Sequence, residues 1–317
     1  MKRRDFLTSS ALAATAGLAG LRVAPVLAQD GAAGLAVARS FPVGDRTVTA
    51  LSDGFLPIAA DALIGITPEE FATLLADAHI SADAHPTGVN AYLIEGGGET
   101  VLVDVGTGTA MGPSLGHVLA NLTAFGTDPA EIDRLVATHL HPDHIGGLLG
   151  DGGNPFPNAG LVTQRAEVAF WSDDSIRDGA PEGVRGFFDM ARAAVAAFGD
   201  RVETVDGETD LGNGLTLMPL PGHTPGHSGV MLESAGDSLL IWGDIVHVGP
   251  VQFPRPEVTI GFDTDKEMAA ATRAKVFDMV ATDGLRIAGM HIGFPGIGYV
   301  EKGHSGYGFT PAPFPYG

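Results

Sequence analysis

The sequence predicts an α/β fold in which two β-sheets pack together and helices cover their outer faces. Short apolar runs with β-like patterning occur in two groups, one in each half of the chain, and helical patterns separate and follow them. With 317 residues, of which 44% are hydrophobic, the chain can bury a large core. No internal repeat or low-complexity linker occurs after residue 40. A single domain of two sheets with helices outside accounts for this pattern.

The first half of the chain alternates β-like and helical segments. Its β-like runs cover residues 47–51, 91–94, 100–104 and 134–138. Its helical patterns cover residues 68–79 and 112–125. The second and third β-like runs flank Gly96-Gly97-Gly98, which favours a hairpin because glycine readily adopts the backbone angles of tight turns.

The second half begins with a helical insertion and then returns to strands. The helical patterns cover residues 164–171, 181–198 and 265–282. The β-like runs cover residues 215–220, 230–232, 238–242 and 286–290. The last helical pattern is long and precedes the last β-like run, so it is expected on the outer face of the second sheet.

Charge and composition exclude several classes of function. Acidic residues outnumber basic residues 38 to 18, which gives a formal net charge of −20. Such a surface repels phosphate backbones and anionic headgroups, so we expect neither a nucleic-acid nor a membrane partner. The chain has no cysteine, which excludes disulfides, thiolate metal sites and a thiol nucleophile. Histidine and carboxylate side chains must therefore hold any bound metal.

Residues 1–28 have the pattern of an export signal. A basic start is followed by an apolar stretch rich in alanine and glycine, and Ala28 ends a sequence suited to signal peptidase. The start, Arg3-Arg4-x-Phe-Leu, resembles a twin-arginine signal, a route that carries folded proteins. Arg22 interrupts the short apolar stretch, which argues against a membrane anchor. We therefore expect a mature catalytic domain of residues 29–317 in the periplasm or outside the cell.

The strongest functional signal is the sequence THLHPDHIGG over residues 138–147. His139 and His141 stand two apart after an apolar run, so both can point to one side of an extended segment. Asp143 and His144 then open a turn that two glycines allow to close tightly, where they can face a second metal ion. Imidazole and carboxylate ligands suit zinc, and also iron, manganese or cobalt. The alternative is a cluster of surface histidines.

Further ligands are expected directly after other β-like runs, because ligands from separate strands must meet at one end of a sheet. His223, Asp244 and His291 occupy such positions. Each alone is more often a turn residue or a helix cap. Together with the cluster they give five histidines and two aspartates, enough for two metal ions that share a carboxylate.

The motifs H-x-H-x-D-H, P-G-H-T-P-G-H-S, W-G-D and G-M-H, taken together, resemble the metallo-β-lactamase superfamily. Asn90 and the sequences Tyr-Leu-Ile and Val-Asp-Val-Gly that follow it match the early hairpin of that superfamily. The resemblance covers about residues 45–295 and implies an αββα sandwich of four layers. It implies a first metal site made of His139, His141 and His223. It implies a second site made of Asp143, His144 and His291, with Asp244 bridging the two.

Within this superfamily, the sequence resembles the methyl-parathion hydrolase and lactonase-like group. The grounds are the chain length, the export signal, the wording H-L-H-P-D-H-I-G-G and the ligand spacing. This resemblance implies that aromatic side chains of the helical insertion, Trp171, Phe187 and Phe188, line a hydrophobic pocket over the metals. Ordinary core packing is the alternative for these three side chains.

The resemblance implies a dinuclear metal-dependent hydrolase. A hydroxide bridging the two ions would attack a small neutral, apolar ester such as a lactone, an aryl ester or an organophosphate triester. Two alternatives stay open: a mononuclear iron oxidoreductase of the persulfide dioxygenase type and a glutathione-thioester hydrolase. A β-lactamase is disfavoured because no cysteine ligand is present, and a metal-binding module without catalysis is the remaining class.

Asp143 and His247 are expected to act in catalysis. Asp143 is also expected to be a metal ligand. Lactonases that open homoserine lactones carry a tyrosine three residues beyond the bridging aspartate, where this chain has His247. An imidazole there can donate a proton to an alkoxide leaving group. Asp104 is expected to hydrogen-bond a ligand histidine, or to be a turn residue, and His227 is expected to be structural. The segment 303–317 could cover the pocket or dock a second copy in a homodimer.

Overall fold

The computed structural model describes residues 37–80, 83–150 and 153–313. The predicted export signal, residues 1–28, lies outside the described residues. Among the described residues, no helix has both the length and the apolar character that crossing a bilayer requires.

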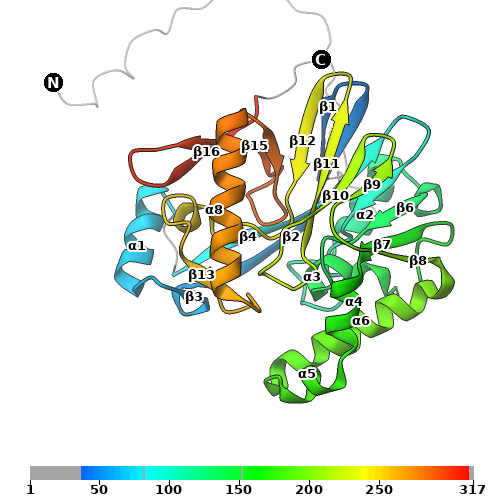
Figure 1. Ribbon diagram of the computed structural model, residues 1–317, viewed down its shortest axis with the longest axis horizontal. Helices are drawn as coiled ribbons and strands as arrows, with labels where there is room; N and C mark the ends of the chain where they lie inside the picture. Colours follow the sequence, from blue (N-terminus) through cyan, green and yellow to red (C-terminus); the bar gives the residue numbers. More distant parts are fainter. Residues whose placement is uncertain (1–36, 81–82, 151–152, 314–317) are drawn as a thin grey trace, which may run out of the picture. The chain divides into compact units, whose positions relative to one another are not determined.

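Two mixed β-sheets, each of seven strands within the described residues, form the centre of the fold (Figure 1). In order across the first sheet, the strands are β1 (Ala38–Val43), β2 (Arg46–Ala59), β4 (Ala84–Glu95), β5 (Val101–Val103), β6 (Arg134–Val136), β7 (Gly160–Gln164) and β8 (Val202–Val205). Across the second, they are β16 (Tyr307–Pro311), β15 (Ile297–Lys302), β14 (Arg286–Ala288), β12 (Asp237–Ile241), β11 (Ser228–Ser234), β10 (Leu215–Pro219) and β9 (Thr209–Gly212). A small ribbon pairs β3 (Leu63–Ile64) with β13 (Thr259–Ile260).

Eight α-helices lie in the described part of the chain. They are α1 (Pro68–Asp77), α2 (Val118–Phe125), α3 (Pro142–Ile145), α4 (Arg165–Ser172), α5 (Asp174–Gly179), α6 (Glu182–Phe198), α7 (Gly249–Gln252) and α8 (Lys266–Asp283). Figure 1 shows the long helix α8 beside strands of the second sheet, while α4, α5 and α6 form the helical insertion.

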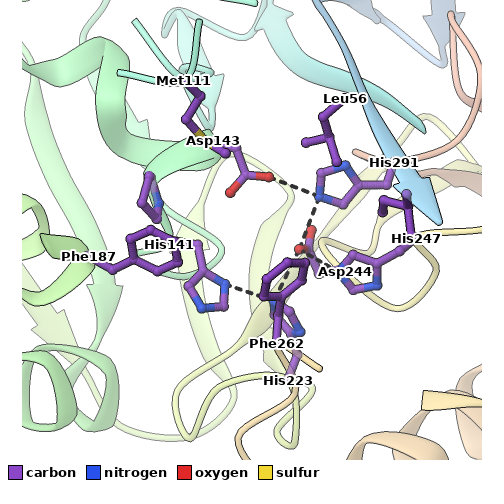
Figure 2. Close-up of a pocket in the computed structure, with 12 residues that line it drawn as sticks. Leu56, Met111, His141, Asp143, Phe187, His223, Asp244, His247, Phe262 and His291 are labelled. Carbon is purple, nitrogen blue, oxygen red and sulfur yellow. Dashed lines mark hydrogen bonds and ion pairs between the residues drawn. The ribbon is translucent and has the colours of Figure 1, made fainter. Parts of the chain in front are cut away.

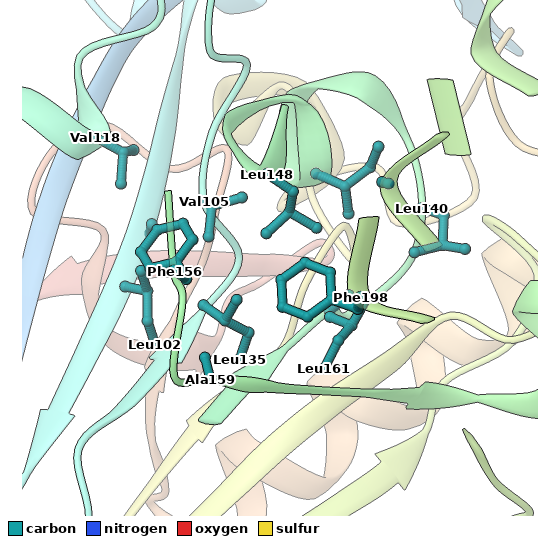
Figure 3. Close-up of a cluster of buried hydrophobic side chains, with 14 of the residues drawn as sticks. Leu102, Val105, Val118, Leu135, Leu140, Leu148, Phe156, Ala159, Leu161 and Phe198 are labelled. Atoms are coloured by element: carbon teal, nitrogen blue, oxygen red, sulfur yellow. The ribbon is translucent and has the colours of Figure 1, made fainter. Parts of the chain in front are cut away.

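Alternating side chains divide the core into layers. In β4, Tyr92 and Ile94 point into the cluster between the two sheets, whereas Leu93 points to the helices on the outer face of the first sheet. Figure 3 shows that outer cluster, which includes Leu102 of β5 and Phe198 of α6. A third cluster packs α8 against the second sheet. The predicted αββα sandwich is confirmed.

The predicted elements agree with the structure where the hydrophobic pattern is strong. The hairpin at Gly96-Gly97-Gly98 joins β4 and β5, which pair antiparallel. The predicted helix over residues 112–125 is wrong over its first six residues, because the helix begins at Val118. Gly112 and Gly116 have φ of 95° and 89°, and a Cβ on Gly116 would lie 2.0 Å from a main-chain oxygen. That backbone forms a close-packed loop instead of a helix.

Parallel pairing determines where the loops of the site emerge. Strands β12 and β14 run parallel, as do β5, β6 and β7. Parallel strands end at the same edge of a sheet, so the segments that follow β12 and β14 leave the second sheet side by side. Asp244 and His291 lie on these two segments.

A buried carboxylate fastens the loop after β5 to the first sheet. Asp53 lies at a register shift in β2 and is fully buried. It accepts hydrogen bonds from the backbone N–H groups of Thr107, Gly116 and Val118 at 3.0, 3.0 and 3.1 Å, and from the Thr107 hydroxyl at 2.8 Å. The two carboxyl oxygens accept hydrogen bonds from all four donors, so Asp53 holds this loop in place.

Replacing Asp53 by asparagine tests this account of the loop. The amide keeps one acceptor oxygen but presents an NH₂ group to the remaining donor, which stays buried and unpaired. We expect a loss of about 1–3 kcal/mol in the free energy of unfolding and a melting temperature lower by roughly 2–10 °C. Asp45→Asn changes an exposed carboxylate and serves as the control. Equal melting temperatures for the two variants would contradict the account.

Candidate metal centre

The seven residues predicted as metal ligands converge at one edge of the sandwich. They come from the loop after β6, from α3, and from the loops after β10, β12 and β14. Each of these side chains except Asp143 is buried. Figure 2 shows five of them around one cavity. Segments far apart in the chain therefore meet where the spacing of the motifs predicts.

The first group contains three imidazoles and one carboxylate. In His139, His141, His223 and Asp244, one potential ligand atom from each residue lies within 4.8 Å of the others. Nδ1 of His141 is 2.9 Å from Nε2 of His139 and 2.9 Å from Nε2 of His223. Three ring nitrogens that face one point in a buried space are the donor set expected for a divalent cation.

The second group contains Asp143, His144 and His291, whose potential ligand atoms also lie within 4.8 Å of one another. Asp244 lies between the groups: its Oδ2 is 3.2 Å from Nε2 of His223 and 3.1 Å from Nε2 of His291. Its Oδ1 is 3.2 Å from Nε2 of His144. This carboxylate is therefore positioned to bridge two ions.

Nε2 of His144 and Oδ1 of Asp244 are buried and lie 3.2 Å apart, within ion-pair distance, but neither makes a hydrogen bond within the described residues. Both atoms therefore keep binding capacity that a group between them can use. A lone pair on imidazole and an anionic oxygen both pair with a cation. The residues present therefore fit two divalent metal ions.

The electrostatics of the cluster favour added positive charge. Burial lowers the pKa of His141 well below its usual value, which leaves a neutral ring with a free lone pair. Burial opposes the charge on Asp244, but the neighbouring imidazoles, with His144 first, hold the pKa of that carboxyl well below its usual range. Burial also opposes the charge on His291, yet the Asp244 and Asp143 carboxylates raise the pKa of His291 to about 10.

Carboxylates behind the cluster orient two of the imidazoles. Nδ1 of His144 is 2.7 Å from Oδ2 of Asp104, and Nδ1 of His223 is 2.8 Å from Oδ1 of Asp263. Each carboxylate accepts a hydrogen bond from Nδ1–H, so Nε2 is the nitrogen left for a metal ion. The hydrogen bond expected from Asp104 to a ligand histidine is confirmed. No local pattern in the sequence marks Asp263, which lies in a loop before α8.

His227 has the structural place that the sequence predicts. Its Nδ1 donates to the carbonyl oxygen of Leu220 at 2.7 Å, and its Nε2 accepts from the backbone N–H of Asp244 at 2.8 Å. Burial lowers the pKa of His227 to about 3, which keeps the ring neutral and Nε2 an acceptor. His227 thus fixes the backbone beside the bridging carboxylate.

His247 lies beside the cluster and faces the cavity. Its Nε2 is 3.1 Å from Oδ2 of Asp244, and its ring stacks on that of His291 with a centroid distance of 5.0 Å. Its backbone N–H donates to Oε1 of Gln252 at 2.7 Å, which fixes the turn. The structure therefore places this imidazole next to both the predicted ligands and the space for a substrate.

Apolar side chains line the cavity over the cluster together with the predicted ligands (Figure 2). The apolar side chains that line it are Leu56, Ile58, Met111, Pro142, Phe187 and Phe262. Met111 and Phe262 are exposed by 38% and 48%, so they form part of the rim. No lysine or arginine lines this cavity in the described part of the chain.

The three predicted pocket aromatics have different places. Phe187 lines the cavity, and its ring centroid is 6.2 Å from that of His141. Trp171 and Phe188 are buried and do not line this cavity. Their rings contact each other edge to face, and both line an adjoining hollow, which Phe187 shares. Trp171 also contacts His141 edge to face at 5.2 Å.

Glu167 is a further buried carboxylate close to the first group of predicted ligands. It lies in α4, yet its side chain is fully buried behind the loops that carry His141 and His223. Glutamate in a helical pattern is usually exposed, so nothing in the local sequence marks this residue.

Comparison with solved structures finds close similarity over nearly the whole described chain. The hydrolase AbOPH of the beta lactamase superfamily superposes with a TM-score of 0.83 and 33% identity, and the match covers 87% of this chain and 98% of AbOPH. The dizinc quorum-quenching lactonase AidC superposes with a TM-score of 0.83 and 25% identity, covering 88% of this chain and 99% of AidC.

Curated relatives match over shorter segments. The N-acyl homoserine lactonase AttM of Azorhizobium caulinodans is 33% identical over 131 residues, which cover 38% of this chain and 44% of AttM. The N-acyl homoserine lactonase of a Bacillus species is 23% identical over 156 residues, covering 49% of this chain and 54% of the lactonase. The chain thus spans about half the length of the curated relatives it matches.

The family model described as the metallo-beta-lactamase superfamily matches residues 85–291. The matched segment is more than half of the chain and contains all seven predicted ligands, from His139 to His291. The four-layer fold and the grouped imidazoles and carboxylates agree with this match. The chain belongs to the metallo-β-lactamase superfamily.

Proposed function

We propose that this protein is a dinuclear zinc hydrolase that cleaves small neutral, apolar esters. The observation that carries the proposal is the position of Asp244, a buried carboxylate shared by two groups of ligand atoms beneath an apolar cavity. His139, His141 and His223 would hold one ion and Asp143, His144 and His291 the other. Bound zinc would supply a water of lowered pKa and an electrophile for the ester oxygen.

The residues around the two groups prepare the site for this chemistry. Asp104 and Asp263 fix two of the rings, so little reorganisation is needed during the reaction. Asp143 is the least buried of the ligands and faces the cavity, where it can orient the attacking water as well as bind metal. His247, which lines the cavity with its Nε2 3.1 Å from Oδ2 of Asp244, would donate a proton to the departing alkoxide.

The cavity wall supports a neutral substrate. Its apolar side chains can bury an acyl chain or an aromatic ring, while the absence of lysine and arginine from this wall leaves an anionic group without a partner. Lactones, aryl esters and organophosphate triesters share these properties. The lactonase activity of the curated relatives and of AidC supports a lactone among the substrates. The export signal predicted at residues 1–28 supports action in the periplasm or outside the cell.

Metal analysis tests the proposal directly. We expect the purified protein to hold two zinc ions per chain and to lose ester hydrolysis on exhaustive chelation, with recovery when zinc is added back. Asp244→Ala should hold less than one ion and lose about a hundredfold or more in kcat/KM. His304→Ala alters an exposed histidine and is the control. One iron per chain together with oxygen consumption would support the persulfide dioxygenase alternative instead.

Replacing His247 by alanine tests its place as a proton donor. Turnover of lactones and alkyl esters, which have poor leaving groups, should fall about a hundredfold, because the departing alkoxide loses its proton source. Turnover of nitrophenyl esters should change much less. His85→Gln, which alters a buried histidine outside this cavity, should leave the ratio of the two rates unchanged. Equal losses on both kinds of ester would exclude a role in protonation.

Phe187→Ala tests the apolar wall. Loss of this ring should raise KM for an aryl ester or a long-chain lactone by roughly tenfold, about 1.4 kcal/mol, with a smaller change in kcat. Phe125→Ala removes a ring that is 39% exposed and does not line the cavity, so its kinetics should match the wild type. An unchanged KM for Phe187→Ala across substrates of different size would contradict substrate binding at this wall.

A further inference from the structure

The carboxylate of Glu167 connects helix α4 to the loop after β6 and to the loop after β10. Its side chain is fully buried on helix α4, within the helical insertion. Oε1 accepts from the backbone N–H of Leu140 at 3.0 Å and from Nε1 of Trp171 at 2.6 Å. Oε2 accepts from the hydroxyl of Thr224 at 2.7 Å and from the backbone N–H of Gly226 at 3.0 Å.

Three of these partners lie on the two separate loops that carry the first group of predicted ligands. Leu140 stands between His139 and His141, on the loop after β6. Thr224 directly follows His223, on the loop after β10 in the other sheet. A single carboxylate therefore spans the boundary between the two sheets at the point where their imidazoles must meet.

Steric contact reinforces this arrangement. A Cβ on Gly226 would lie 2.4 Å from the backbone nitrogen of Glu167 and 2.7 Å from its Cβ. The loop after β10 can approach α4 this closely only because glycine occupies position 226. The second glycine of the P-G-H-T-P-G-H-S motif is thus explained by contact with Glu167.

We propose that Glu167 is a positioning residue that sets the distance between the His139–His141 pair and His223. It does so by accepting hydrogen bonds from both loops at once. Through Trp171 it also ties the wall of the adjoining hollow to the same loops. This inference rests on the proposed metal site, and it concerns the first group of ligands only.

The four hydrogen-bond partners of Glu167 predict which substitution at this position weakens metal binding more. All four are donors, so only an ionised carboxylate satisfies them together. In Glu167→Gln, the amide oxygen can keep the bonds to Leu140 and Trp171, while its NH₂ group can donate to the Thr224 oxygen but faces the N–H of Gly226. In Glu167→Ala, both loops lose their common partner. Binding at the first group should therefore weaken more in Glu167→Ala than in Glu167→Gln.

Zinc binding by competition with a chelator, measured in two backgrounds, tests the proposal. In the Asp143→Ala background, which removes a ligand of the second group, Glu167→Ala should raise the zinc dissociation constant by about 10- to 100-fold, and Glu167→Gln should raise it less. In the His223→Ala background, which removes a ligand of the first group, both substitutions should leave the dissociation constant unchanged. The visible spectrum of cobalt-substituted protein should shift only in the first background.

Asp53→Asn is the matched control, because Asp53 also accepts four hydrogen bonds in a buried position but contacts neither ligand group directly. It should lower the melting temperature without raising the dissociation constant. Glu167 variants that melt earlier but bind zinc as the wild type does, or that weaken both backgrounds equally, would overturn the proposal. A wild-type protein without two metal ions would overturn the proposed function itself, which separates the two failures.

Discussion

The structure depends on a buried carboxylate that needs positive charge around it. Removing an ionised carboxyl group from water costs several kcal/mol unless opposite charge or hydrogen bonds replace the lost hydration. Asp244 is almost fully buried, and four predicted ligand imidazoles from three segments approach it within 3.6 Å. Each of these segments must be held in place for the arrangement to exist. The fold holds the segments that carry these imidazoles in place around Asp244.

Several buried carboxylates hold the loops of the structure in place through hydrogen bonds. Asp53 and Glu167 each accept four hydrogen bonds, most of them from donors on loops, and Asp104 and Asp263 each combine a backbone N–H with a histidine Nδ1. Loops lack the repeating hydrogen bonds of a sheet, so their N–H groups need other acceptors. A carboxylate can satisfy several donors that converge from different segments. Part of the acidic excess of this chain is therefore internal and structural.

The sequence predicted the ligands because their signal is local. His139, His141, Asp143 and His144 lie within six positions, and the other three follow strands whose hydrophobic pattern is strong. The places of Glu167 and Asp263 could not be predicted, because each depends on contact between segments that only the tertiary fold brings together. Edge strands such as β1, β9 and β16 were missed for a related reason: they are partly exposed and lack a continuous apolar run.

The same difference between local and tertiary signals explains why only one of the three predicted pocket aromatics lines the cavity. The sequence identifies Trp171, Phe187 and Phe188 as aromatic residues of one insertion, but helical geometry turns Phe187 and Phe188 about 100° apart. Phe187 therefore faces the cavity, while Phe188 enters the core beside Trp171. Trp171 bonds to Glu167, which also bonds to the loop between His139 and His141. The helical insertion thus contributes one ring to the cavity, while another of its rings belongs to the hydrogen-bond network that holds the loop between His139 and His141.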